Sequence, residues 1–167
     1  MNNKYNITFY DMQWNVFKEN EIGIYYLLNG SLKKSNFVEE GYNVDYSKST
    51  LRKELNNGKL AESLRSEFGD RLITITTNLL ALNGEDDFGV VGGDILAIPT
   101  LDLYRECRKS IIDIDETWWL ATSAGSRLKG FERLSLLYID RKGNVCETNL
   151  GATWSYNGVR PYFILKH

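Results

Sequence analysis

Histidine is almost absent from this 167-residue chain, because His167 is the only one and is also the last residue. A Ser-His-Asp or Cys-His catalytic unit would therefore depend on a chain end, where side chains are poorly held. A zinc site would have this imidazole and two distant thiols, at Cys107 and Cys146. The sequence argues against histidine-based catalysis and against zinc.

Sequence motifs for cofactor binding are missing too. No phosphate-binding loop of the form G-x-x-x-x-G-K occurs, and Gly89, Gly92 and Gly93 lack the preceding strand and following helix of a dinucleotide fingerprint. We therefore expect no cofactor and no enzymatic activity. A carboxylate-dependent hydrolase is kept as the last of three hypotheses, because the separation of two catalytic carboxylates is spatial. Its candidate residues are Asp86, Asp87, Asp94, Glu132 and Glu147.

Cysteine is scarce, and long apolar runs are absent. Cys107 and Cys146 allow a disulfide, two buried thiols, or one of each. We expect reduced, buried thiols, since a chain of this length needs no covalent bridge. No signal peptide and no membrane span are predicted, because no apolar run follows a basic start and none is long enough to cross a bilayer. We expect a location in a host-cell cytoplasm or in a virion, and no membrane partner.

Neither sign of charge dominates. The chain has 20 Lys and Arg against 22 Asp and Glu, for a formal net charge of −2. No strong positive field gathers phosphates from solution, so we expect no direct nucleic-acid binding. The same balance argues against an inhibitor that mimics DNA over a large surface.

Aromatic residues are what the chain has in abundance. They make up 13% of it, within a hydrophobic fraction of 43%. A chain of this size buries roughly two-thirds of the surface that its unfolded form exposes, so a single domain over residues 1–167 is expected to have a substantial core.

Alternating or β-branched apolar residues predict strands toward both ends of the chain, and helical spacing appears between them. Leu51 and Leu55, then Leu60, Leu64 and Phe68, predict two short helices or one broken helix. A third helix is expected after Thr100 as N-cap, with Leu101, Tyr104 and Cys107 facing inward. The expected strands are 7–10, 14–18, 22–28, 71–77, 95–98, 117–122, 134–139, 145–150 and 158–165.

Strands, then helices, then strands again predict the α+β class. We expect one compact domain with a twisted, mainly antiparallel sheet, two or three flanking helices and long loops. The loops are 31–47, 83–94 and 123–132. Two tyrosines of the first loop, Tyr42 and Tyr46, are candidate binding residues.

The loop 83–94 is acidic. Asp86, Asp87 and Asp94 could offer oxygen ligands to Ca²⁺, but their spacing fits no EF-hand register. The favoured interpretation is a solvated loop without a metal.

Two adjacent tryptophans, Trp118 and Trp119, are the most unusual feature. In a strand their side chains must point to opposite faces. Either both rings are packed, which we favour because large aromatics dominate cores, or the outward ring joins Trp154 and Tyr156 in an aromatic platform for a sugar or a protein. Arg160 is interpreted as a structural clamp in preference to an anion site.

These residues resemble a family. Trp118-Trp119-Leu120, followed by a hairpin and Gly158-Val159-Arg160-Pro161, is similar to the C-terminal hallmark of a widespread uncharacterised domain of bacteria and their phages. That domain is itself similar to the formylglycine-generating-enzyme branch of the C-type-lectin-like fold. The segments 7–16, 46–56 and 94–106 resemble the family as well.

The resemblance implies a rigid scaffold beneath an irregular loop surface, which suits recognition. Three departures limit it. Ala121-Thr122-Ser123 replaces the family's usual arginine, serine and proline, no copper-binding cysteine pair aligns, and the calcium motifs of true lectins are absent.

The first functional hypothesis is a non-catalytic recognition domain of phage or mobile-element origin that binds a protein or glycan through its loops. The second is a small intracellular phage-encoded inhibitor of a host defence enzyme. Neither the partner nor the oligomeric state is predicted by the sequence.

Overall fold

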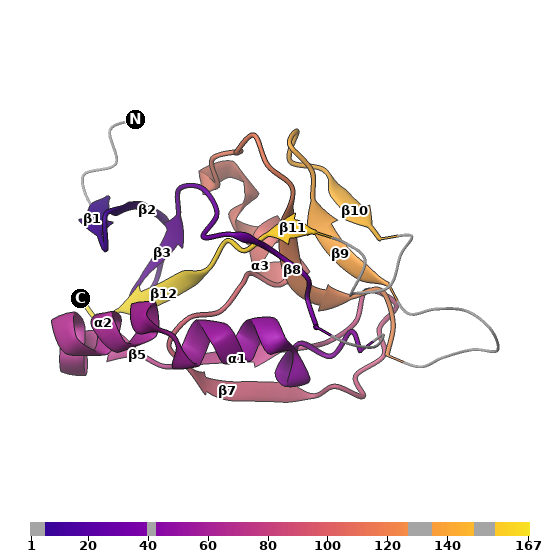
Figure 1. Cartoon of the computed structure of the whole chain (residues 1–167), viewed down its shortest axis with the longest axis horizontal. Helices are drawn as coiled ribbons and strands as arrows, with labels where there is room; N and C mark the ends of the chain where they lie inside the picture. The colour runs from indigo at the N-terminus through magenta and orange to yellow at the C-terminus, as the bar shows by residue number, and fades with distance from the viewer. Residues whose placement is uncertain (1–5, 40–42, 127–134, 149–155) are drawn as a thin grey trace.

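The computed structural model describes residues 6–39, 43–126, 135–148 and 156–167, and over these residues the strands form two five-stranded sheets and a two-stranded ribbon (Figure 1). The first sheet has the order β1-β2-β3-β12-β5, with every neighbouring pair antiparallel. The last strand of the chain thus lies inside this sheet. Its strands are β1 (Ile7–Phe9), β2 (Met12–Glu19), β3 (Ile24–Leu28), β5 (Leu72–Ile73) and β12 (Tyr162–Leu165).

The second sheet has the order β10-β9-β8-β11-β4. Its pairs are antiparallel except β8 with β11, which run parallel where Gly158 lies opposite Trp118. The ribbon pairs β6 with β7. The bounds are β4 (Lys34–Ser35), β6 (Ile75–Asn78), β7 (Val90–Asp94), β8 (Trp118–Ser123), β9 (Leu136–Ile139), β10 (Val145–Glu147) and β11 (Asn157–Gly158).

Three α-helices form in the described part of the chain, and two of them begin at a hydroxyl cap, that of α3 being the predicted Thr100. The Ser49 hydroxyl accepts a hydrogen bond from the Arg52 amide at 3.1 Å, and the Thr100 hydroxyl accepts one from the Leu103 amide at 3.2 Å. Mixed strands and helices confirm the α+β class. The helices are α1 (Thr50–Asn57), α2 (Lys59–Phe68) and α3 (Leu101–Cys107), with 3₁₀ turns η1 (Tyr46–Lys48), η2 (Gly69–Arg71) and η3 (Arg108–Ser110).

The central strands of both sheets are covered on both sides, because their successive residues enter two different apolar clusters. In β8, Trp119 and Ala121 belong to the cluster that contains the leucines of α1 and α2. Trp118 and Leu120 belong to the cluster that contains the inward residues of α3. In Figure 1, α1 and α2 accordingly run across the front of the molecule and α3 lies behind β11 and β8. Alternation along β8 therefore decides which apolar cluster each tryptophan enters.

Three strand predictions are wrong in detail. The run 71–77 is divided between β5, which belongs to the first sheet, and β6, which belongs to the two-stranded ribbon. The run 158–165 is divided between β11 and β12, because the chain crosses from one sheet to the other at Arg160 and Pro161.

The run 95–98 is buried but forms no strand, apart from a single bridge between Ala97 and Tyr162. The amides of Ile95 and Leu96 instead bond to the Asn56 side chain at 2.7 and 3.1 Å. Conversely, β7 lies within the stretch 83–94 that was expected to be a loop.

Gly23, at the turn between β2 and β3, leaves no room for a side chain. A Cβ there would lie 2.2 Å from the carbonyl oxygen of Leu165 on the neighbouring strand β12. We expect Gly23→Ala to lower the free energy of unfolding by about 1–3 kcal/mol, because the strands must move apart. Urea denaturation measures this loss, with Glu21→Ala in the same turn as control. Equal midpoints for the two variants would contradict the expectation.

Candidate binding surface

Trp118 and Trp119 are both buried, at 1% and 0% exposure, so neither contributes to an exposed aromatic platform. The Trp119 indole N–H donates to the Ser35 carbonyl at 2.8 Å, and its ring meets Phe37 edge-on. Trp118 packs edge-on against Tyr104 of α3. The two rings therefore lock β8 to the segment around β4 on one side and to α3 on the other.

Arg160 is buried directly beside this pair. Its guanidinium lies 5.1 Å from the centre of the Trp118 ring and donates to the carbonyls of Leu28 and Ile112 at 2.8 and 2.9 Å. Its Nη1 atom has no hydrogen-bond partner. Burial lowers the pKa of this guanidinium to about 10. The arrangement is that of a clamp between three chain segments, with no opening to an anion in solution.

The remaining residues of the hallmark also stabilise the fold. Leu120 is buried, and the Pro161 carbonyl accepts from the Leu28 amide at 3.0 Å. Gly158 is required sterically, since a Cβ there would lie 2.9 Å from the Ser31 Cβ and 3.0 Å from the Thr117 oxygen.

Asp94, one of the calcium candidates, is paired with an arginine. Both of its carboxylate oxygens accept from Arg52, at 2.8 Å from Nε and 2.7 Å from Nη2, and the carboxylate is almost fully buried. Asp86 and Asp87 are exposed in the loop before β7. Among the residues that the structure describes, no group of three or more His, Cys, Asp or Glu side chains could hold a metal ion.

The remaining aromatic candidates do not come together among the described residues. Tyr46 is fully buried, with its hydroxyl accepting from the Ile98 amide at 3.4 Å. Tyr156 is 65% exposed. Tyr42 and Trp154 lie outside the described residues, as does Glu132.

Buried phenols make the fold sensitive to alkali. Burial, more than any neighbouring charge, raises the pKa of Tyr46 and Tyr162 far above the ordinary 10.0. The unfolded chain ionises these groups first, so stability is present below pH 10 and falls as the pH rises above it. Each phenol contributes a loss of about 1.4 kcal/mol per pH unit, and Arg160, whose pKa is lowered, acts in the opposite sense.

We therefore expect a net fall in the urea midpoint between about pH 10 and pH 12, with most of it removed in Tyr162→Phe. A midpoint that stays level over this interval in the parent chain would contradict the expectation.

Two loops that sequence analysis proposed as a binding surface are joined by backbone hydrogen bonds. The amides of Leu82 and Asn83 donate to the carbonyls of Ser123 and Ala124 at 2.9 and 3.1 Å. The Ser126 amide donates to the Glu85 carboxylate at 2.7 Å. The loop between β6 and β7 is thus held against the segment after β8, at the end of the molecule where β7 begins (Figure 1).

This loop presents aliphatic side chains to solvent. Leu80 and Leu82 are 40% and 46% exposed and alternate with the buried Leu79 and Ala81, while Val90 at the start of β7 is 64% exposed. We call Leu80, Leu82 and Val90 the loop patch. The loop patch was not predicted from strand periodicity, because the residues that stand out in the sequence from 83 to 94 are glycines and carboxylates.

Two of the hydrolase candidates, Asp94 and Glu147, lie on different strands and have partners of their own. Asp94 is paired with Arg52, and Glu147 lies on β10, where it accepts from the Ser135 hydroxyl. Neither of the two pockets described, one beside α1 and α2 and one beside β2 and η3, is lined by Asp86, Asp87, Asp94 or Glu147.

The two cysteines are unpaired. Cys107 is buried on α3, where burial raises the pKa of its thiol, whereas Cys146 on β10 is only half-buried. No helix in the described segments combines the length and the apolar character needed to cross a membrane. Comparison with protein-family models, with curated proteins and with solved structures finds no match to this chain.

Proposed function

We propose that this domain is a non-catalytic recognition module that binds a protein partner through the loop patch. The observation that carries the proposal is the exposure of Leu80, Leu82 and Val90 on a loop whose backbone is tied down by hydrogen bonds. Neighbouring exposed aliphatic residues are typical of interaction sites, and a loop that is already ordered loses little entropy on binding. The module functions in a host-cell cytoplasm or in a virion.

A protein fits this surface better than a glycan does. Sugar recognition relies on exposed aromatic rings beside polar groups, whereas the loop patch is aliphatic. Tyr10 and Tyr156 are the strongly exposed aromatic residues of the described chain, and neither belongs to the patch.

The finer fold assignment is part of the same proposal, namely a C-type-lectin-like domain of the phage and bacterial family that carries the hallmark. Its support is the way in which the hallmark residues meet. Gly158 pairs with Trp118 across two strands, and Arg160 lies against the Trp118 ring.

The test begins with affinity capture from the native host and identification by mass spectrometry, followed by calorimetric titration of the purified partner. We expect Leu80→Asp/Leu82→Asp to weaken binding at least tenfold, because the contact loses its apolar centre. Ile22→Asp is the matched control, since Ile22 is 51% exposed on the turn between β2 and β3, outside the patch.

Unchanged affinity in the double variant, with the fold intact by circular dichroism, would reject the loop patch as the binding site. Where the captured partner is an enzyme, its activity in the presence of the domain separates an inhibitor from a passive binder.

A further inference from the structure

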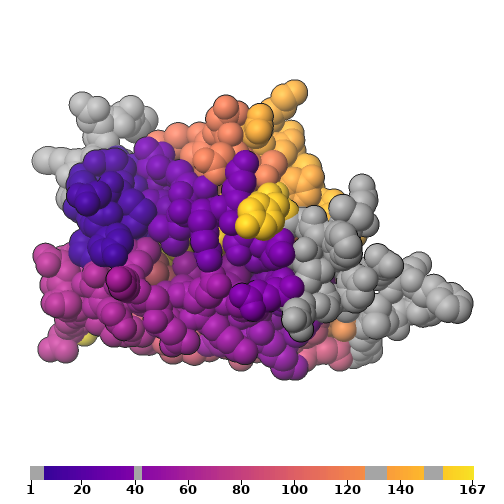
Figure 2. Space-filling model, in the orientation of Figure 1, coloured from indigo at the N-terminus to yellow at the C-terminus, as the bar shows by residue number. Residues whose placement is uncertain are grey.

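A second candidate site lies away from the loop patch, at the junction of α1 and α2. A pocket of about 150 Å³ opens there. In Figure 2 the violet atoms that follow β3 lie beside the purple atoms of α1 and α2. The pocket, here called the junction pocket, is lined by Leu32, Lys33, Leu51, Glu54, Leu55, Gly58, Leu60 and Val159.

The walls of the junction pocket are fixed by backbone structure. Leu51 and Leu55 are successive inward residues of α1. Opposite them, the Leu32 amide donates to the Val159 carbonyl at 2.9 Å and the Val159 amide donates to the Lys33 carbonyl at 2.8 Å. The backbone of both walls is thus held by hydrogen bonds.

Gly58 lines the pocket at the break between the helices. A Cβ at this position would lie 2.8 Å from the Glu54 carbonyl oxygen, so the close approach of the backbone requires glycine. Atoms that line an apolar space without a partner lose dispersion contacts, which an apolar ligand group of matching size restores.

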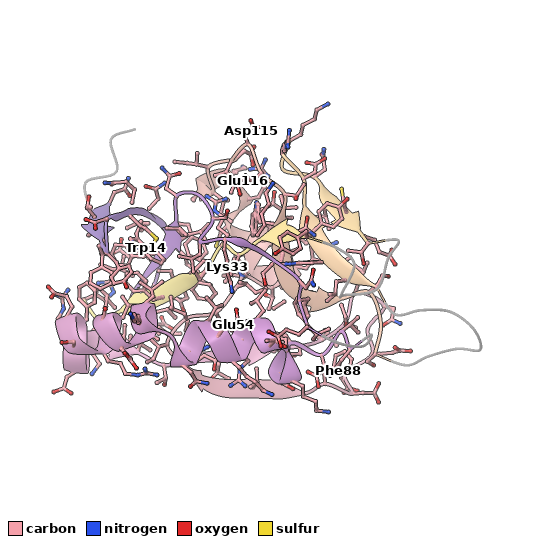
Figure 3. All side chains as sticks on the ribbon, viewed as in Figure 1. Trp14, Lys33, Glu54, Phe88, Asp115 and Glu116 are labelled. Carbon is pink, nitrogen blue, oxygen red and sulfur yellow. The ribbon has the colours of Figure 1, made fainter. Side chains whose placement is uncertain are left out.

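The mouth of the pocket carries one charge of each sign. The Lys33 ammonium donates to the Glu54 carboxylate, and the two side chains face each other between α1 and the segment after β3 (Figure 3). They are 53% and 41% exposed, and an ion pair this open contributes little to stability. The pair can therefore separate for a ligand at small cost.

We propose that the junction pocket binds a free apolar α-amino acid of the leucine or phenylalanine class. The side chain enters the aliphatic space, which has the volume of a cavity that takes a benzene-sized group. The ligand carboxylate bonds to Lys33 and its ammonium to Glu54. A zwitterion suits this mouth better than a ligand with one charge, because it leaves neither Lys33 nor Glu54 unpaired.

The test uses three small molecules and amide-resolved heteronuclear NMR of the full chain. L-Leucine carries both charges, isocaproate keeps the carboxylate alone, and isoamylamine keeps the ammonium alone. We expect saturable shifts of junction-pocket amides with a millimolar Kd, and leucine to bind about fivefold more tightly than either analogue.

Charge variants assign the two contacts. Lys33→Met should reduce leucine affinity to about that of isoamylamine, and Glu54→Gln to about that of isocaproate. Lys34→Met and Glu62→Gln, which change exposed residues outside the pocket, should leave it unchanged. Absence of saturable shifts up to about 50 mM, equal affinity for the three molecules, or insensitivity to Lys33→Met would each overturn the proposal.

Discussion

Truncation of Trp119 to alanine should lower the free energy of unfolding by about 3–5 kcal/mol, one of the two largest losses expected from a single substitution. The indole is fully buried, meets Phe37 edge-on and donates its N–H to Ser35. Removal leaves a cavity between β8 and the segment around β4 and leaves the Ser35 carbonyl without that donor. Chemical denaturation, with calorimetric Tm as a second readout, measures the loss.

Tyr156→Ala is the control for this variant, because it also removes an aromatic ring but from a side chain that is 65% exposed. We expect its effect to stay within about 0.5 kcal/mol. If Trp119→Ala and Tyr156→Ala had the same midpoint, the placement of Trp119 in the core would be wrong, and this ring would return to the candidate ligand contacts.

Arg52→Met should cost a comparable amount, about 3–5 kcal/mol, for a different physical reason. The substitution leaves the Asp94 carboxylate buried at the end of β7 without its two donors. An uncompensated buried charge is far more costly than the loss of an exposed ion pair. Lys53→Met, at an exposed neighbouring position of α1, serves as control.

A double variant separates charge burial from simple loss of packing. Asp94→Leu in the Arg52→Met background removes the unpaired carboxylate, so it should recover a large part of the lost stability. A double variant as unstable as Arg52→Met would show that the ion pair itself is not the source of the effect.

The segment 49–56 shows how much of a fold local sequence can predict. The apolar stripe of Leu51 and Leu55 is a local signal, and the helix forms where it indicates, with Ser49 as its N-cap. The contacts of Arg52 and Asn56 were not predictable from the sequence. Both side chains hold the segment 94–96, about forty positions further along the chain, and no periodicity reports a partner so distant.

The prediction of a strand over 95–98 was wrong for the same reason. Apolar β-branched residues favour a strand, but Asn56 supplies the hydrogen-bond partner of Ile95 and Leu96 that a neighbouring strand would have given. Tyr46 is a related case. The sequence predicts a loop residue able to reach a ligand, whereas the Tyr46 hydroxyl accepts a hydrogen bond from the Ile98 amide in the core.

For the candidate surfaces, the sequence indicates which segments are involved but not which side chains are exposed. Alternation placed Trp118 and Trp119 on opposite faces, but both faces are covered by helices and loops, which the sequence of β8 does not encode. The leucines of the loop patch directly precede a run of glycines and carboxylates. Whether Leu80 and Leu82 are exposed depends on the tertiary structure that buries Leu79 and Ala81. The junction pocket joins residues from 32 to 159 and follows from tertiary structure alone.

The internal position of β12 has a consequence for biosynthesis. Tyr162–Leu165 bond to β3 on one side and to β5 on the other, so these strands have no shared neighbour until β12, which follows both in the sequence, has been synthesised. Until then, the edge of β3 that pairs with β12 in the folded protein stays without this partner. Such an edge is a target for chaperones and for aggregation of nascent chains, and slow assembly through distant contacts prolongs that exposure.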